Sequence, residues 1–202
     1  MSDFSGLPFK RYNEIRDQIQ SGDILLCSGD YVSSRLTRQA NGSCWNHVAF
    51  VLRLDSIDWI VVLESIVDKG IRVIPLSEYV KNYEGTGKGY RGKLVLGRHA
   101  EFSQKVTTDA LKRVFKFAFD RFFAPYDEQE VARITARTAG RFLGFKKNEI
   151  ERKHEYSCSE YVHECYRMLG IDVCYDDSWF VAPSDFAVND SLRLLWELET
   201  ES

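Results

Sequence analysis

Two neighbouring apolar stretches have the length and composition of β-strands. Residues 47–54 and 59–66 are rich in valine, isoleucine and aromatic side chains, and the polar pair Asp55-Ser56 separates them. Such a pattern is typical of two strands joined by a short turn, so we expect a β-hairpin. Shorter apolar runs predict four further strands, at residues 23–27, 71–74, 93–97 and 191–198.

Helical periodicity takes over in the second half of the chain. Apolar residues recur at intervals of three and four over residues 108–123, which predicts a helix with one buried face. Since strands cluster first and helices follow, the order favours an α+β fold, with an antiparallel sheet packed against helices. Further helices are expected at residues 12–20, 31–40, 128–143 and 157–169.

The composition is that of one ordinary globular domain. The 202 residues include 44% hydrophobic and 28% charged residues, enough for a single core over residues 1–202. A net charge of −3 gives no strongly basic face, so nucleic acid is not an expected partner. We find no signal-peptide pattern and no apolar run of about 18 residues. A cytoplasmic location without a membrane span is therefore expected.

The five cysteines are not expected to form a disulfide framework, because their number is odd and nothing indicates secretion. Cys158 stands apart because Ser157 and Glu160 have the spacing of a capping box, which places this cysteine in the first turn of a helix. The exposed N–H groups of that turn favour a thiolate and an oxyanion. Taken alone, Cys158 is equally a residue that merely begins the inner face of the helix. The others are interpreted as small buried hydrophobic residues: Cys27, Cys44, Cys165 and Cys174.

His47 and Glu64 supply the remaining groups of a thiol hydrolase. Glu64 follows an apolar run in the second strand of the hairpin, where an unpaired charge would be costly to bury. A carboxylate beside His47 would hold one imidazole nitrogen and leave the other for the thiol of Cys158. The sequence therefore predicts a Cys-His-Glu triad, and the alternative is a His–Glu pair with a structural role only.

The turn of the hairpin decides whether His47 and Glu64 meet. If the chain turns at Asp55-Ser56, Leu54 pairs with Ile57, and His47 then lies directly opposite Glu64 on one face. The Cβ atoms of such a pair are about 4.5–5.5 Å apart. A turn displaced by one residue would put the two side chains on opposite faces.

Six short motifs surround these residues in a characteristic order. They are Gly22-Asp23-Ile24-Leu25-Leu26, Trp45-Asn46-His47-Val48-Ala49-Phe50-Val51, Leu63-Glu64-Ser65, Ala124-Pro125-Tyr126-Asp127, Tyr156-Ser157-Cys158-Ser159-Glu160-Tyr161-Val162 and Ala182-Pro183-Ser184-Asp185. From Ser21 to about Asp185, the chain resembles the circularly permuted NlpC-type amidases, the YiiX-like branch of the papain-like superfamily. In papain itself the cysteine precedes the histidine, whereas here it follows.

The resemblance implies a papain-like α+β fold with Cys158 as nucleophile, His47 as base and Glu64 as the polar third member. It implies a cysteine amidase or peptidase that cleaves an amide bond in a small peptide-like substrate, such as a cell-wall stem peptide, through a thioacyl intermediate. No cofactor or metal is expected. The chain departs from the family at Ala49, where members often carry glycine, and in a long helical insertion around residues 98–155.

Two other functions remain open. A lipid acyltransferase or thioesterase would use the same triad on an acyl substrate, and a non-catalytic binding module would keep only the cleft. Four further residues are candidates for substrate binding, although packing and helix capping are the more common roles of such residues: Tyr126, Tyr156, Ser159 and Asp185.

Overall fold

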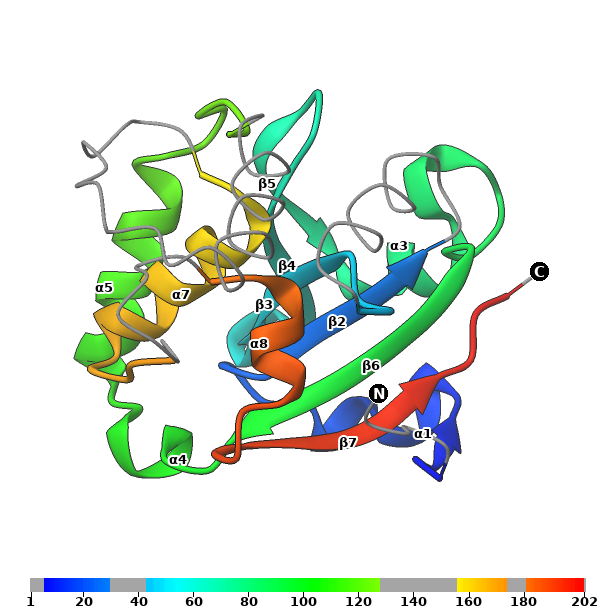
Figure 1. The fold of residues 1–202 in the computed structure, drawn as a ribbon, viewed down its shortest axis with the longest axis horizontal. Helices are drawn as coiled ribbons and strands as arrows, with labels where there is room; N and C mark the ends of the chain where they lie inside the picture. Colours follow the sequence, from blue (N-terminus) through cyan, green and yellow to red (C-terminus); the bar gives the residue numbers. More distant parts are fainter. Residues whose placement is uncertain (1–5, 30–42, 128–155, 174–180, 202) are drawn as a thin grey trace, which may run out of the picture.

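A seven-stranded sheet organises the part of the chain that the computed structural model describes, residues 6–29, 43–127, 156–173 and 181–201. Its strands lie in the order β1-β7-β6-β2-β3-β4-β5 (Figure 1). Neighbouring strands are antiparallel, except that β1 runs parallel to β7. The bounds are Phe9–Lys10 for β1, Ile24–Gly29 for β2, His47–Leu54 for β3, Trp59–Ile66 for β4, Gly70–Pro75 for β5, Gly92–His99 for β6 and Leu192–Leu198 for β7.

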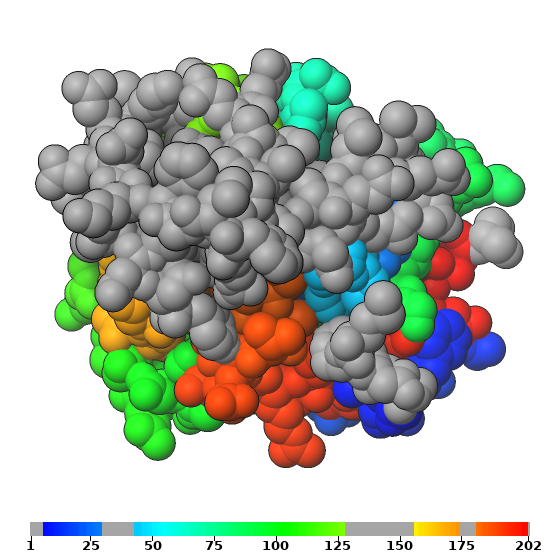
Figure 2. Space-filling model, in the orientation of Figure 1, coloured from blue at the N-terminus to red at the C-terminus, as the bar shows by residue number. Residues whose placement is uncertain are grey.

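Helices cover both faces of this sheet. Helices α5 and α7 pack together on one face, and α1 and α3 lie on the other (Figure 1). The surfaces of α4, α8 and β7 form the lower part of the face seen in Figure 2. None of the described helices has the length and apolar character needed to cross a membrane. The bounds are Tyr12–Ile15 for α1, Leu76–Lys81 for α3, Phe102–Lys105 for α4, Thr108–Phe119 for α5, Cys158–Met168 for α7 and Pro183–Ala187 for α8.

Alternation along the central strands divides the core into two layers. In β3, Val48 and Phe50 belong to the cluster that includes the inner face of α7. Ala49 and Val51 belong to the opposite cluster, which includes residues of α1 and α3. Successive side chains of a strand point to opposite faces, so the odd-numbered position of His47 places its side chain on the face of α1 and α3.

The hairpin of β3 and β4 has the predicted strands but not the predicted register. Its turn is a 3₁₀ segment, Asp55–Ile57, followed by Asp58 in the left-handed region with φ 51°. Leu54 consequently pairs with Trp59, and the predicted pairing of Leu54 with Ile57 is wrong. Asp55-Ser56 alone made the turn look two residues shorter than it is.

The error leaves His47 and Glu64 on the same face. The register pairs Phe50 with Leu63. Continued along the strands, it places Ala49 opposite Glu64, and His47 lies two residues before Ala49 on the same face. Since side chains alternate with a period of two, a displacement of two residues preserves the face. His47 is therefore a diagonal neighbour of Glu64 instead of a direct partner, still within reach of long side chains.

The α+β class is confirmed, and so are the strands at residues 47–54 and 59–66. The helix expected at 108–123 ends at Phe119, and the one at 12–20 is divided into α1 and the 3₁₀ segment Arg16–Gln18. The helices expected at 31–40 and 128–143 lie outside the described residues. Of the insertion around 98–155, α4 and α5 occupy the described portion, and its identity as an insertion stays a prediction.

Gly22 fixes how α7 sits against the sheet. Its φ is 87°, and an added Cβ would lie 1.6 Å from the ring of Phe102. The hydroxyl of Tyr166, on the inner face of α7, donates a hydrogen bond of 2.7 Å to the carbonyl oxygen of Gly22. A residue without a side chain thus lets α4 and α7 approach the start of β2 together.

We expect Gly22→Ala to lower the free energy of unfolding more than Gly170→Ala. Both glycines have positive φ, 87° and 74°, and each substitution costs roughly 1–2 kcal/mol in backbone strain. Only alanine at position 22 also meets the ring of Phe102, because an added Cβ at Gly170 has nothing within 4 Å. Overpacking should add about 1–3 kcal/mol. Urea denaturation of both variants checks this, and equal losses would contradict it.

Candidate active site

Glu64 is a carboxylate with no solvent exposure, placed near the end of β4. Its Oε2 lies 2.6 Å from Nε2 of His47 and also accepts a hydrogen bond from the hydroxyl of Tyr79. Its Oε1 accepts a 2.7 Å hydrogen bond from Nε of Arg72, the cross-strand partner of Glu64 on β5. Three elements, β3, β5 and α3, therefore supply donors to one buried acid.

These donors determine the charge of Glu64. Burial alone would raise its pKa, since a carboxylate loses its hydration. The hydrogen bond and charge of His47, followed by the charge of Arg72 and the Tyr79 hydroxyl, outweigh burial and lower the pKa of Glu64 to about 2. The carboxylate is thus ionised at neutral pH and accepts hydrogen bonds only.

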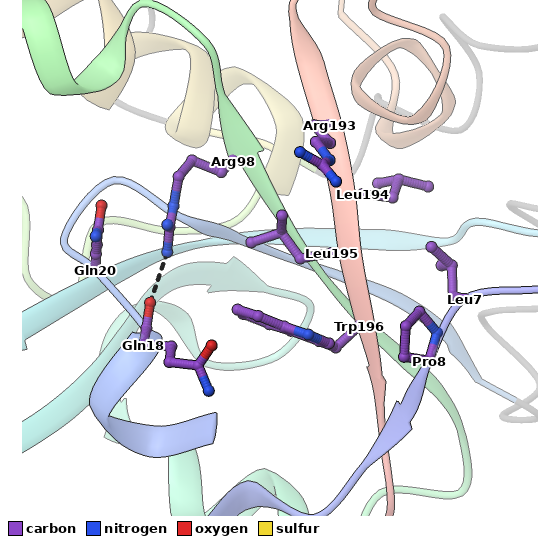
Figure 3. Close-up of a pocket in the computed structure, with 9 residues that line it drawn as sticks. All are labelled: Leu7, Pro8, Gln18, Gln20, Arg98, Arg193, Leu194, Leu195 and Trp196. Atoms are coloured by element: carbon purple, nitrogen blue, oxygen red, sulfur yellow. Dashed lines mark hydrogen bonds between the residues drawn. The ribbon is translucent and has the colours of Figure 1, made fainter. Parts of the chain in front are cut away.

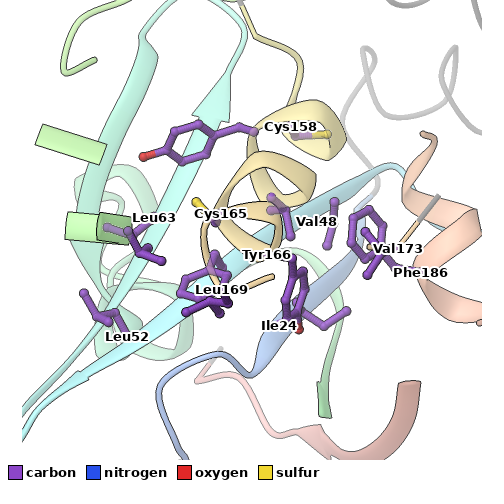
Figure 4. Close-up of a cluster of buried hydrophobic side chains, with 14 of the residues drawn as sticks. Ile24, Val48, Leu52, Leu63, Cys158, Cys165, Tyr166, Leu169, Val173 and Phe186 are labelled. Carbon is purple, nitrogen blue, oxygen red and sulfur yellow. The ribbon is translucent and has the colours of Figure 1, made fainter. Parts of the chain in front are cut away.

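Cys158 begins α7 in the predicted way. The backbone N–H of Glu160 donates a 3.3 Å hydrogen bond to the Oγ of Ser157. In the other direction, the backbone N–H of Ser157 donates a 3.0 Å hydrogen bond to the carboxylate of Glu160. The capping box is confirmed. The Cys158 side chain is 2% exposed and occupies the first turn of the helix, as Figure 4 shows.

Three observations bring Cys158 to the end of the sheet that carries His47 and Glu64. The Oγ of Ser65, next to Glu64, donates a 2.7 Å hydrogen bond to the carbonyl of Tyr156, two residues before Cys158. Cys158 packs in one cluster with Val48 and Leu63, which flank His47 and Glu64 in the chain. Helix α7 also contacts both β3 and β4.

A fourth observation is electrostatic, because both Glu64 and Cys158 affect the pKa of Cys27. This thiol lies opposite His47 in the pairing of β2 with β3 and is completely buried. Burial raises its pKa well above the usual value, and the negative charges of Glu64 and Cys158 raise it further. The sulfur of Cys158 and the carboxylate of Glu64 therefore both lie within electrostatic reach of Cys27.

His47 and Cys158 approach the sheet from different faces. Glu64 is bonded by Tyr79, which belongs to the cluster on the face of α1 and α3, whereas Cys158 belongs to the cluster on the face of α7. His47 is the first residue of β3. Any contact between the imidazole and the thiol would therefore lie at the end of β3 that His47 begins.

The two tyrosines predicted to bind substrate lie together before α7. Tyr126 and Tyr156 form an isolated β-bridge. The Tyr156 hydroxyl accepts a 2.9 Å hydrogen bond from Nε of Arg121, and its ring packs edge-on against Phe117. These contacts give Tyr156 a packing role, and substrate binding by either tyrosine stays a prediction.

The other two predicted binding residues sit at helix starts. Ser159 is fully buried, with its Oγ 3.4 Å from the Oγ of Ser157. The carboxylate of Asp185 accepts a 2.8 Å hydrogen bond from the backbone N–H of Ala182 and caps α8. Capping gives Asp185 a structural role, while a contact of Ser159 or Asp185 with substrate stays a prediction.

Sequence reasoning missed Arg72 and Tyr79, which complete the surroundings of Glu64. Arg72 had a usable signal, since an arginine between Ile71 and Val73 interrupts a short apolar strand next to one that carries an acid. Tyr79 had none, because only the packing of α3 brings its hydroxyl to Glu64.

A cavity of about 640 Å³ lies apart from these residues. Arg98 and Arg193 line it together with Trp196, on strands β6 and β7 (Figure 3). Strand β2 separates β6 and β7 from β3 and β4 in the sheet. The cavity is therefore not the surroundings of His47 and Glu64.

Residues 18–200 match a protein family described as permuted papain-like amidase enzyme, YaeF/YiiX, C92 family. The chain belongs to this family. The fold resembles the crystal structure of metalloprotein yiiX from Escherichia coli O157:H7, with a TM-score of 0.59 and 16% identity over 89% of this chain and 99% of that one. No curated protein sequence matches the chain.

Membership of the permuted papain-like amidase family supports a cysteine hydrolase. The yiiX structure is described as a metalloprotein. Within the described ranges, no group of three or more His, Cys, Asp and Glu side chains is arranged to hold a metal ion. Both oxygens of Glu64 are also already bonded by protein donors.

We expect Glu64→Gln to remove part of the acid sensitivity of this amidase-family fold. The folded pKa of Glu64 is about 2 against an ordinary 4.5. Its ionisation therefore stabilises the folded state above pH 4.5, and this stabilisation is lost as the pH falls towards 2. The free energy of unfolding of the variant should change less over that interval than that of the wild type. Urea titrations at several pH values check this, with the exposed Glu14→Gln as control; parallel pH profiles of wild type and Glu64→Gln would contradict it.

Proposed function

We propose that this permuted papain-like amidase cleaves an amide bond of a small peptide-like substrate, such as a cell-wall stem peptide. Cys158 is the nucleophile, His47 the general base and Glu64 the group that orients the imidazole. The observation that carries the proposal is the 2.6 Å contact between Nε2 of His47 and the buried, ionised Glu64.

That contact assigns different roles to the two imidazole nitrogens. The ionised carboxylate only accepts, so Nε2 of His47 must carry a proton. In the neutral ring Nδ1 is then the acceptor, and it takes the proton of the Cys158 thiol. The mechanism requires Nδ1 to reach the Cys158 sulfur while Nε2 stays with Glu64.

The start of α7 supports the thiolate that results. Its exposed N–H groups and the positive end of the helix dipole favour a negative charge on Cys158. The thiolate attacks the substrate carbonyl carbon, and the backbone N–H of Cys158 stabilises the oxyanion. The C–N bond then breaks as the His47 imidazolium gives its proton to the leaving amine. Water, deprotonated by His47, hydrolyses the thioester and restores the thiol.

Cys27 is the rival nucleophile at this end of the sheet, and its surroundings argue against it. It is completely buried, and burial together with the charges of Glu64 and Cys158 raises its pKa. A thiol in such surroundings stays protonated and unreactive. Cys27→Ala is consequently the matched control for Cys158→Ala.

We expect an alkylating agent at pH 6 to label Cys158 before any other cysteine. An ordinary thiol has a pKa of about 8.5 and is almost entirely protonated at that pH, whereas His47 and the start of α7 keep Cys158 as thiolate. Cys44 is exposed and competes through access alone, so the experiment uses a Cys44→Ala background. Peptide mass spectrometry after timed iodoacetamide treatment measures each site. Labelling that is equal across the cysteines, or unchanged in His47→Ala, would count against the assignment.

We expect Cys158→Ala and His47→Ala to abolish hydrolysis of a stem-peptide fragment, and Cys27→Ala to retain it. Glu64→Gln should lose less than either, because it orients the base without touching the reacting atoms. Amine release, followed by mass spectrometry on folded variants, measures each rate. Retained turnover in Cys158→Ala would remove it from the mechanism. A wild type that cleaves an acyl thioester but no peptide amide would support the lipid acyltransferase or thioesterase alternative.

A further inference from the structure

Arg72 stands at the centre of a chain of alternating charges that ends on the candidate triad. Its Nε bonds Glu64 at 2.7 Å, and its Nη1 lies 2.7 Å from Oε1 of Glu84. Lys69 pairs with the other oxygen of Glu84. The Arg72 side chain is 17% exposed, so this series of ion pairs leads from the half-exposed Lys69 inwards to the fully buried Glu64. A guanidinium bound at two edges cannot rotate without breaking one pair.

Two unfavourable features accompany this placement of Arg72. Glu84 adopts φ 56° and ψ 26°, a left-handed conformation that a side chain with a Cβ disfavours. The Nη2 of Arg72 is buried without a hydrogen-bond partner among the described residues. Strained backbone and unsatisfied donors persist where the surroundings over-determine them, and they cluster at functional sites. Both features here concern the position of one guanidinium.

We propose that Arg72 is a positioning residue, itself fixed by Glu84, which locks the orientation and the charge of Glu64 so that His47 presents Nδ1 to Cys158. This rests on the proposed function of His47 and Cys158. Arg72 occupies Oε1, so Oε2 is left for His47 and Tyr79 in a single carboxylate rotamer. Without Arg72, the carboxylate turns about its terminal torsion and the imidazole loses its fixed direction.

The groups that face Glu64 decide the sign of the pH effect. They come from four strands or turns and one helix: Cys27 on β2, His47 on β3, Lys69 before β5, Arg72 on β5 and Tyr79 on α3. His47 lowers the pKa of Glu64 by its charge, and two further cations face the acid, Lys69 and the nearer Arg72. Removing the nearer cation favours the protonated acid and raises the pKa of Glu64. The acid side of the pH–rate profile then moves to higher pH.

The first experiment needs no substrate. Carboxyl ¹³C NMR, with the Glu64 signal assigned by its loss in Glu64→Gln, follows ionisation from pH 2 to 6. In Arg72→Gln the midpoint of Glu64 should rise by about one to three pH units. Arg72→Lys keeps a cation without the planar guanidinium and should give a smaller rise, so the test survives if Arg72→Gln does not fold. An unchanged midpoint in both variants overturns the proposal.

The second experiment separates positioning from mere stability. At a temperature well below unfolding, kcat of Arg72→Gln should fall about 10- to 100-fold with KM little changed, and the fall should deepen below pH 5. Arg72→Lys keeps the positive charge without the planar set of guanidinium N–H donors, so its kcat should fall less than that of Arg72→Gln. Arg53→Gln is the matched control, because Arg53 is ion-paired to Asp55 at the other end of β3. An Arg72→Gln variant that is less stable but retains wild-type kcat and pH profile overturns the proposal.

The proposed function and the positioning role of Arg72 are contradicted by different results. A wild type without thiol-dependent turnover, or turnover retained in Cys158→Ala, removes the proposed function while the NMR midpoints still report on Arg72. Normal turnover that is lost with Cys158 but insensitive to Arg72 removes the positioning role alone.

Discussion

The structure depends on a carboxylate that cannot reach water. An isolated ionised acid in such a place would cost far more than any single packing contact returns, so Glu64 must be met by donors. His47, Arg72 and Tyr79 meet it from β3, β5 and α3. This requirement connects β3 and β5, which flank β4, with helix α3, whose position no local sequence pattern indicated.

The same requirement determines the direction of catalysis. An acid that stays ionised forces a proton onto the nitrogen of His47 that faces it, so the basic nitrogen faces away. Helix α7 lies on the other face of the sheet, and its capped first turn is brought to the same end through the bond from Ser65 to Tyr156. Cys158 and the residues around Glu64, the proposed nucleophile and the surroundings of the proposed base, thus belong to separate layers of the core. Chain order has no bearing on such an arrangement, since a triad is defined by geometry and role.

The sequence predicted whatever depends on local pattern. The strands of the hairpin and the capping box at Ser157 follow from periodicity and spacing alone, whereas the shared face of His47 and Glu64 also depended on the register. The register did not follow from local pattern, because Asp55-Ser56 gives no indication that a 3₁₀ turn extends to Ile57. The shared face survived only because the displacement was even. Arg72 and Tyr79 depend on which elements pack together, and a tyrosine in a short helix gives no sign of the acid that its hydroxyl will meet.

A buried ion pair is a poor way to gain stability. Well-packed apolar residues of similar volume are often as good or better, because the desolvation of both charges offsets their attraction. Here the arrangement adds to that cost a left-handed Glu84 and an Nη2 of Arg72 that has no hydrogen-bond partner in the described part of the chain. What it achieves is a carboxylate with one rotamer and one charge state, bonded through one oxygen to an imidazole. An apolar core cannot provide that, and a base that must take a proton from sulfur in a fixed direction requires it. The unfavourable local geometry around Arg72 is therefore better understood as a property of the site than as a defect of the fold.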